Sequence, residues 1–483
     1  MAQTETARPD FDPIARVEHP TVAERTERGR AARRRCPRAS HGELRAGTRD
    51  AVAILRRQEI TRVPELVPIR YGRMLTSEFA FYRGSAAVMA HDLAGDPRTE
   101  LRVQLCGDAH LANFGGFASP ERRLVFDLND FDETHPGPFE WDVKRLAASV
   151  EIAGRHRGID PAGCTACVGI AVRSYREAMR EFAEMGNLDI WYAHLDVDDL
   201  RTQLRESGTR RTQQLETRLA KASAKAVTKD SMKALGKLTS DDGGDRRIIS
   251  DPPLIVRMAD LAETSSTPVE KIEAELHRAF RAYRHTLQGE RRHLLESFRW
   301  VDIARKVVGV GSVGTRCFIM LLLGRDDSDP LFLQAKEAGP SVLEPYLGAS
   351  PYANHGQRVV EGQRLMQAAS DIFLGWVRME VTFDGRPRDF YFRQLWDWKA
   401  SADLETIQPH GLEAYARACG WTLARAHARS GDAVAIAAYL GKSTAFDEAV
   451  QAYATAYAER NAADYAALQA AAEAGTIEVE TDY

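Results

Sequence analysis

This sequence has no long hydrophobic run. The longest strongly apolar stretch is Cys317–Leu323, whereas a membrane-spanning helix needs roughly 20 apolar residues. The opening residues, MAQTETARPDFDP, are polar and acidic and lack the apolar centre of a secretory signal. We therefore expect no membrane partner and a cytoplasmic location.

Cysteine is scarce as well. The six cysteines are scattered along the chain, and Cys164-x-x-Cys167 is their one close pair. Without a second pair a zinc ribbon is not supported. A redox pair is one interpretation, but the small residues around it predict a helix with two packed thiols. Such sparse cysteines are typical of a protein in a reducing cytoplasm.

The chain also lacks an excess of one charge. It carries 65 basic and 69 acidic residues, for a net charge of −4, so no general attraction to nucleic acid or to a membrane surface is expected. Residues 28–35 (RGRAARRR) form the one dense basic cluster. Such a cluster could contact phosphate or nucleic acid, but it is more often the solvated face of a helix. With 44% hydrophobic residues the composition is globular.

What the chain does contain is a polar motif between residues 105 and 133. Asp108 and Asn113 lie five residues apart in G-D-x-H-x-x-N, and the apolar stretch Leu124–Leu128 leads into Asp130 and Asp132. Metal-assisted phosphoryl transfer uses an acid at the attacking hydroxyl, and an amide and a second carboxylate on Mg²⁺. The alternative is a polar turn with two Asx caps, which would not require this spacing. We favour the first interpretation.

The motif also carries a resemblance. G-D-A-H-L-A-N followed by N-D-F-D-E resembles the catalytic loop and metal-binding motif of the protein-kinase-like superfamily, with aminoglycoside and choline kinases as the nearest branch. The wider chain resembles the bacterial domain-of-unknown-function family 2252, through RMLTSEFAFYRGSA (73–86) and GPFEWDVKRLAAS (137–149). The sequence departs from the kinase pattern in two places. Cys106 stands where the loop commonly has His, and the strand that follows offers three acids where one is needed.

The resemblance implies roles for these residues. Asp108 becomes the base or hydroxyl-orienting acid, and Asn113 and Asp130 become metal ligands that Asp132 could assist. Asp130 is preferred over Asp127 because Asp130-Phe-Asp matches an Asp-Phe-Gly-like turn. In kinase-like folds an acid placed like Asp142 braces the catalytic loop through backbone N–H groups. A plain helix N-terminal acid predicts the same residue.

A second motif lies between residues 301 and 338. A β-like stretch leads into G-V-G-S-V-G, which contains Gly309, Gly311, Ser312 and Gly314, and further apolar stretches lead to Lys336. A lone glycine motif of this kind could mark a dinucleotide-binding unit, but a helix should then follow it directly. Residues 315–323 predict a strand instead. Strand, glycine loop, strand, strand and Lys is the order of a kinase nucleotide lid, in which the loop and Lys336 hold phosphates. The alternative for Lys336 is a surface lysine at a strand end.

A kinase-like site also needs an acid on a helix to hold that lysine. Glu361, in the helix expected at 359–366, is the first candidate, and Glu337 and Glu344 are the runners-up. Strands are expected at 373–382 and 388–395. Residues 394–398 would then form the hinge, where Trp396 and Trp398 are candidates to contact adenine, although core packing is the commoner fate of such rings.

The order of the motifs is unusual, because the Asp108 motif precedes the glycine motif. The helix that contains TLARAHARSGD (422–432) resembles the one that usually leads into the catalytic loop. We therefore expect a circularly permuted, bilobal α+β protein-kinase-like fold with a small, mainly antiparallel β lobe and a large helical lobe. Its expected parts are a tail and helical extension (1–60), a helical lobe (61–300), a β-rich nucleotide lobe (301–400) and completing helices (401–483). The alternative is that residues 1–150 and 300–400 never meet.

The expected function is phosphate transfer from ATP, with Mg²⁺, to a hydroxyl of an unidentified small molecule. AMP transfer and nucleotide binding without turnover remain alternatives on the same fold, and a Rossmann-type oxidoreductase is a weaker one. Arg83 could reach a phosphate or carboxylate, or form a structural ion pair. The charged residues 205–237 predict an exposed helix, a lid or a substrate-facing arm, and residues 240–245 (SDDGGD) predict a flexible break.

Overall fold

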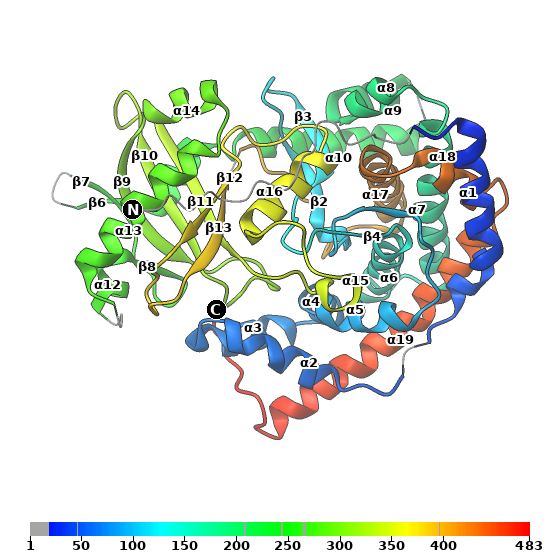
Figure 1. The fold of residues 1–483 in the computed structure, drawn as a ribbon, viewed down its shortest axis with the longest axis horizontal. Helices are drawn as coiled ribbons and strands as arrows, with labels where there is room; N and C mark the ends of the chain where they lie inside the picture. Colours follow the sequence, from blue (N-terminus) through cyan, green and yellow to red (C-terminus); the bar gives the residue numbers. More distant parts are fainter. Residues whose placement is uncertain (1–18, 46, 207–208, 243–244, 264–266, 396) are drawn as a thin grey trace.

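The computed structural model describes residues 19–45, 47–206, 209–242, 245–263, 267–395 and 397–483. Helices and antiparallel sheets are both present, so the expected α+β class is confirmed. Figure 1 shows the larger sheet on one side of the molecule and most of the long helices on the other.

The larger sheet has six antiparallel strands in the order β12-β13-β11-β10-β9-β8. They are β8 (Ile255–Arg257), β9 (Arg299–Lys306), β10 (Cys317–Leu323), β11 (Pro330–Ala338), β12 (Gly375–Met379) and β13 (Arg388–Gln394). Helices α15 (Glu344–Leu347) and α16 (His355–Met366) connect β11 to β12. The glycine loop, residues 309–314, joins β9 to β10. Because a strand and not a helix follows this loop, the dinucleotide-binding interpretation is wrong.

Strand β10 is buried along its whole length because helices cover both faces of the sheet. Its side chains alternate between two cores, as the strand period of two requires. Phe318, Met320 and Leu322 pack beneath α13 (Val269–His285), where Tyr283 stacks on Phe392 with ring centroids 4.1 Å apart. The other side chains of β10 pack beneath α11 (Ser231–Leu238).

These contacts move the boundary between the lobes. The sequence assigned residues up to 300 to the helical lobe, but α11, α13 and β8 all pack on the sheet. The expected flexible break at 240–245 is a hairpin of β6 (Thr239–Asp242) and β7 (Asp245–Ile248), whose residues 243–244 lie outside the described ones.

The helical part of the molecule is built from segments near both ends of the chain. Its helices, with those of the connecting segments, are α1 (Val22–Arg35), α2 (Ala51–Arg57), α3 (Val67–Met74), α4 (Glu78–Gly84), α5 (Ala86–Gly95), α6 (Glu140–His156), α7 (Pro161–Phe182), α8 (Asn187–Tyr192), α9 (Val197–Glu206), α10 (Arg210–Val227), α12 (Met258–Glu263), α14 (Gly289–Glu296), α17 (Pro409–Ser430), α18 (Ala433–Leu440) and α19 (Ala445–Glu473). The remaining strands are β1 (Arg102–Leu105), β2 (Phe114–Ala118), β3 (Leu124–Leu128), β4 (His135–Pro138) and β5 (Leu195–Asp196).

Helix α17 lies directly against α7 and ends beside β1. A Cβ atom at Gly420 would lie 2.2 Å from the carbonyl oxygen of Ala171, so glycine permits this close packing. At the end of α17 the Ser430 hydroxyl accepts a hydrogen bond from the Gln104 N–H at 3.1 Å. A helix from the end of the chain therefore meets the strand that leads to Asp108.

Two arginines of the basic cluster, Arg28 and Arg33, and Arg25 before it bind α18, while Arg34 and Arg35 are exposed. Arg25 and Arg28 pair with Asp432 at the start of α18, and Arg33 donates to the Tyr439 carbonyl near its end. Helix α1 is thus fastened along α18, and these three arginines are not available as a nucleic-acid contact.

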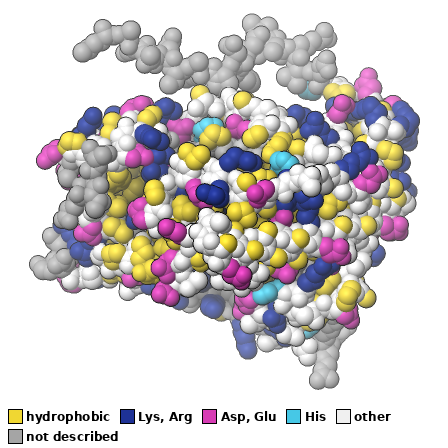
Figure 2. All heavy atoms as spheres, turned by 90° about the horizontal axis from the view of Figure 1, so that it is seen from below, with side chains coloured by type: hydrophobic (Ala, Val, Ile, Leu, Met, Phe, Trp, Pro, Cys, Tyr) yellow, Lys and Arg dark blue, Asp and Glu magenta, His cyan; other side chains and the backbone are white. Residues whose placement is uncertain are grey.

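On the face seen in Figure 2, acidic and basic side chains are interspersed and no large area carries one charge. Among the described residues, no helix combines the length and apolar character needed to cross a bilayer.

Candidate functional site

A cleft of about 940 Å³ brings together segments that lie far apart in the sequence. Its walls are formed by the helices between residues 58 and 86, the Asp108 loop (106–113), the Asp130 turn (129–133), the glycine loop and the end of β11. The alternative that residues 1–150 and 300–400 never meet is therefore wrong.

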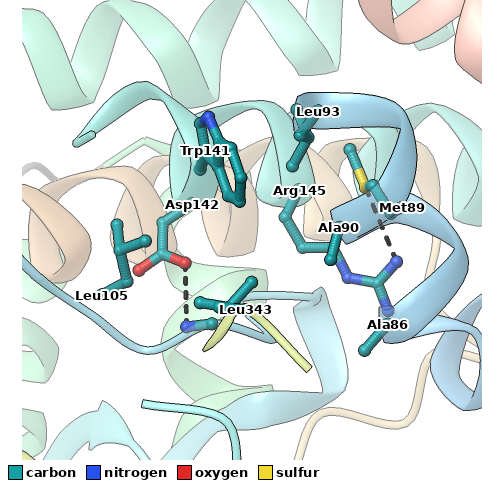
Figure 3. A pocket seen from close by; sticks show the side chains of 10 residues that line it. Ala86, Met89, Ala90, Leu93, Leu105, Trp141, Asp142, Arg145 and Leu343 are labelled. Atoms are coloured by element: carbon teal, nitrogen blue, oxygen red, sulfur yellow. Dashed lines mark hydrogen bonds between the residues drawn. The ribbon is translucent and has the colours of Figure 1, made fainter. Parts of the chain in front are cut away.

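The Asp108 loop is held by hydrogen bonds to the first turn of α6. Asp142, in the first turn of this helix, accepts hydrogen bonds from the N–H groups of Cys106 at 2.6 Å and Gly107 at 3.0 Å. Figure 3 shows the Asp142 carboxylate with one of these two hydrogen bonds. Gly107 has φ of +83°, and a Cβ there would lie 2.3 Å from the Glu133 carbonyl oxygen, so only glycine fits. His427 of α17 lies 3.3 Å from the Asp142 carboxylate. The bracing expected of Asp142 is confirmed.

One helical turn after Asp142, Arg145 fixes the orientation of Asp108. Its Nε and Nη2 donate to Asp108 Oδ1 at 2.9 and 2.7 Å. Arg145 and Asp142 line a small space of about 10 Å³ behind the loop, which Figure 3 shows from close by. The sequence reasoning missed Arg145, although it lies in the motif at 137–149. This contact leaves Asp108 Oδ2 facing His110, whose Nε2 is 3.6 Å away.

Both groups are tuned by burial. Burial raises the pKa of the Asp108 carboxyl above its usual value, against the opposing effect of Arg145. Burial and the nearby Arg83 and Arg145 hold the pKa of His110 well below its usual value, so His110 is neutral near pH 7.

Lys336 lies within β11 and not at a strand end. Its Nζ is 2.6 Å from Asp132 Oδ2 and 3.7 Å from Asp130 Oδ1. Tyr391, opposite Lys336 on β13, donates to Asp132 Oδ1 at 2.6 Å. Against the effect of burial, Lys336 and Tyr391 hold the pKa of Asp132 below its usual value. Burial and the Asp132 charge raise the pKa of Asp130.

The pairing of Lys336 with Glu361 is a correction. Glu361 lies 3.2 Å from Nη1 of Arg364 on the same helix, and Lys336 is paired with Asp132. Asp132, which the sequence analysis assigned to the metal, therefore takes the place beside Lys336 that was expected for an acid on a helix. Helix α16 contributes Arg358 to this region instead. Arg358 lies one turn before Glu361, and its guanidinium donates to the Asp132 carbonyl at 2.7 Å.

Neither runner-up holds Lys336. Glu337 pairs with Arg316 and Arg388 near the end of β11, while Glu344 accepts from the Ser341 N–H at 3.0 Å.

Three of the four glycine-loop residues singled out in the sequence line the cleft: Gly309, Gly311 and Ser312. Ser312 Oγ lies 3.3 Å from Asp132 Oδ2. The fourth, Gly314, packs against Arg62 with φ of +89°, and its carbonyl accepts from the Val63 N–H at 2.8 Å. Gly314 therefore anchors the loop to the helical lobe.

The oxygen ligands available to a metal are few. Asn113 Nδ2 donates to the Asp108 carbonyl at 2.7 Å, which leaves Oδ1 for a cation. The Asp130 side chain is 35% exposed, and both residues line the cleft. In the part of the chain that the structure describes, no three His, Cys, Asp or Glu residues are grouped to hold a metal. One carboxylate and one amide fit Mg²⁺ that is shared with phosphate oxygens, and do not fit a protein-only cage.

The expected hinge follows β13. The Leu395 N–H donates to the Phe332 carbonyl at 2.9 Å, and the Trp398 N–H donates to the Lys229 carbonyl at 2.9 Å. Arg122 lies over the Trp398 ring, 4.3 Å from its centre, and Trp396 lies outside the described residues. Trp398 is thus used in packing.

The charged segment 205–237 is not a free arm. In α10, Leu219 and Ala226 pack near Trp398, while α11 packs on the sheet. This segment therefore packs on the sheet through α11 and near Trp398 through α10.

Two residues that line the cleft, Glu133 and Arg62, were not singled out by the sequence analysis. Glu133 accepts from the Val342 N–H at 2.7 Å, and burial raises the pKa of its carboxyl to about 7. Arg62 reaches the cleft from the segment after α2. Arg83, whose role the sequence left open, also lines the cleft, and no described carboxylate forms an ion pair with it. No short-range sequence signal pointed to Arg62.

The model of a family described as uncharacterized proteins conserved in bacteria (DUF2252) matches residues 62–471. No curated protein matches the chain, and no solved structure matches it.

Proposed function

The chain belongs to the bacterial DUF2252 family, and because that description names no activity, we propose from the cleft itself that the protein is an ATP- and Mg²⁺-dependent phosphotransferase. The proposed scaffold is a circularly permuted protein-kinase-like fold, and the proposed acceptor is a hydroxyl of a small molecule.

One observation carries the proposal. Lys336 Nζ lies 2.6 Å from Asp132 Oδ2 across 204 residues of sequence, and Asp132 lines the cleft that also holds Asp108 and the glycine loop. A lysine, a glycine loop and a pair of acids are the parts that hold a nucleotide polyphosphate and its metal. Here two distant segments contribute them to one place.

The arrangement of elements supports the permuted scaffold. The glycine loop lies between β9 and β10, Lys336 follows on β11, and α16 and two more strands complete the sheet. The hydrogen bond between Ser430 and Gln104 brings the end of α17 to the strand before the Asp108 loop. This is where an unpermuted chain would run directly from helix to loop.

The geometry suggests a division of labour in the reaction. The acceptor hydroxyl lies at Asp108 Oδ2, because Arg145 occupies Oδ1. As the new bond forms between the acceptor oxygen and the γ-phosphorus, the bond to the β–γ bridging oxygen breaks and its electron pair leaves with ADP. The hydroxyl proton passes to Asp108, whose raised pKa favours its uptake. Lys336 and the backbone of the glycine loop hold the phosphates.

Asn113 and Asp130 would hold Mg²⁺, which neutralises charge on the phosphate oxygens when bound. Asp132 keeps Lys336 in place through the contact already described.

The test is calorimetric titration with Mg²⁺-ATP of the wild type, Asp130→Ala and Lys336→Ala. Exposed Asp326→Ala and Lys271→Ala are the matched controls. Removal of one charged contact costs about 1.5–3 kcal/mol, so each site variant should bind about 10-fold or more weakly. If the wild type does not bind ATP, or if only Lys336→Ala has an effect, the shared nucleotide site is wrong.

Labelled ATP separates the alternatives on this fold. Transfer of label from γ-³²P-ATP supports phosphoryl transfer, whereas transfer only from α-³²P-ATP means AMP transfer. Tight ATP binding without ADP formation means a binding protein that does not turn over its nucleotide.

A further inference from the structure

Three arginines gather on the side of the cleft opposite the sheet: Arg62, Arg70 and Arg83, here called the arginine cluster. Arg62 and Arg83 line the cleft. Arg70 stands behind its wall, where Nη2 donates to Gln58 Oε1 at 2.7 Å and to the Gly84 carbonyl at 3.1 Å. Gln58 and Gly84 themselves line the cleft, so all three guanidinium groups belong to one wall.

The hydrogen-bonding capacity of the cluster is only partly used. The Nε atoms of all three arginines are buried without a partner, and so is Nη1 of Arg70. Arg70 is 0% exposed. Within the described residues, none of the three forms an ion pair with a carboxylate. Buried cations without a partner are costly, and natural proteins tolerate them chiefly where an anion binds.

The acids of the cleft are already engaged elsewhere. Asp108 is paired with Arg145, Asp132 with Lys336, and Glu337 with Arg316 and Arg388. Asp130 and Glu133 also line the cleft, and the charge of Glu133 acts on Arg62, but no carboxylate of the described residues forms an ion pair with the cluster.

The cluster reaches from the glycine loop, where Arg62 donates to the Val313 carbonyl and packs on Gly314, to the Asp108 loop. Lys336 and the glycine loop are on the sheet side, whereas Arg83 lies close enough to Asp108 to lower the pKa of that carboxyl. A group bound by the cluster would thus lie next to the residue proposed to accept the hydroxyl proton.

On this side of the cleft, two hydrogen bonds join the helical segment to the glycine loop. The Val63 N–H donates to the Gly314 carbonyl, and Arg73 Nη1 donates to the Gly309 carbonyl at 2.7 Å. Residues 58–74 are therefore tied to the glycine loop, and the space beneath them suits a small acceptor.

We propose that the arginine cluster binds an oxyanionic group, a phosphate or a carboxylate, of a small acceptor whose hydroxyl reaches Asp108. Arg83 and Arg62 contact the anion directly, since a guanidinium donates to either oxyanion with two parallel N–H groups. Arg70 is a positioning residue that holds Gln58 and adds charge. This inference rests on the proposed function for the identity of the acceptor, while the anion site itself is independent of it.

The test measures binding of inorganic phosphate and of acetate by calorimetry. Each titration is done with and without saturating Mg²⁺ and a non-hydrolysable ATP analogue. The proteins are the wild type, Arg83→Gln, Arg83→Lys and, as a matched control, the exposed Arg325→Gln. Circular dichroism and thermal unfolding verify that each variant is folded, and Arg62→Gln replaces Arg83→Gln if the latter is not.

We expect the wild type and Arg325→Gln to bind at least one of the two anions equally well. Arg83→Gln should weaken that binding about 10-fold or more, with partial rescue in Arg83→Lys. The anion that binds identifies the acceptor group as phosphate or carboxylate. Binding should persist, within about 3-fold, when the ATP analogue is present.

Three results would overturn the inference: no binding of either anion, binding that ignores Arg83→Gln, or displacement of the anion by the ATP analogue. Displacement would mean that the cluster holds the nucleotide. Titration of Mg²⁺-ATP on the same samples separates the two proposals. Anion binding without ATP binding refutes only the phosphotransferase, and ATP binding without anion binding refutes only the acceptor site.

Discussion

At the scale of single residues, two neighbouring carboxyl groups of the cleft, Asp132 and Glu133, have pKa values shifted in opposite directions. Asp132 is held ionised by Lys336 and Tyr391, so burial does not neutralise it. Glu133, the next residue, has only the Val342 N–H as a close donor, and burial raises its pKa to about 7. One position is therefore a permanent charge and the other titrates near neutral pH.

Substitution of Glu133 by Gln should stabilise the protein at pH 8. Because the folded pKa is raised above the ordinary 4.5, the stability linked to this group is full below pH 4.5 and is lost as pH rises through about 7. Gln imitates the neutral form, so we expect a gain of about 1–3 kcal/mol at pH 8 that shrinks towards pH 4.5. Urea unfolding at several pH values measures it.

The exposed Glu290→Gln is the matched control for that series. A Glu133→Gln difference of constant size from pH 4.5 to pH 8 would mean that the folded protein does not raise this pKa.

At the scale of elements, the glycine loop is anchored at its last residue. Gly314 has φ of +89°, and a Cβ there would lie 3.0 Å from Cβ of Arg62, so Gly314→Ala meets both backbone strain and a contact. Gly475, after α19, has φ of +66° with open space around it, so Gly475→Ala meets the strain alone. We expect both to destabilise the fold by about 1–2 kcal/mol, with the larger loss at Gly314.

Thermal unfolding of the two alanine variants compares them directly. Equal losses of stability in the two variants would show that the loop moves away from Arg62 without cost. The proposed anchoring of the loop by Gly314 would then be wrong.

The sequence predicted those elements whose own pattern is decisive. The apolar run of β10, the strand β3 before the acids and the long helix α17 were all expected near their observed places. Helices α11 and α13 were expected in the helical lobe but pack on the sheet. The apolar face of an amphipathic helix predicts that the helix is covered, but not which surface covers it. The lobe boundary therefore required the packing of the whole chain.

The same limit applies to the site. Asp108, Asn113 and Asp130, which line the cleft, were singled out because their spacing is typical of a chemical motif within a few residues. The partner of Lys336 was not, since Asp132 and Glu361 both suit the charge and only the fold decides between them. Arg145 was missed for the same reason.

At the scale of the whole molecule, the two ends of the chain depend on each other. Asp432 receives Arg25 and Arg28 from α1 and also caps α18 by accepting from the Ala435 N–H at 3.0 Å. Asp432→Asn keeps a capping oxygen but removes the charge, so α1 should detach more often at a cost of about 1 kcal/mol.

Hydrogen exchange measured by mass spectrometry tests this. Amides of α1 should exchange faster in Asp432→Asn, while peptides of β10 should keep the wild-type rate. Unchanged exchange in α1 would mean that these ion pairs do not hold it.

The fastening of α1 to α18 also has a consequence for biosynthesis. Arg25 and its partner are separated by 407 positions in the chain. At a synthesis rate of about 5–20 residues per second, α1 leaves the ribosome roughly 20–80 s before α18 does. During that interval the nascent chain carries an arginine-rich helix without its docking surface, while β1 and the Asp108 loop wait for α17. Helix α1 is thus among the last elements to be locked in place, and a chain cut short before residue 433 lacks the helix to which α1 is fastened.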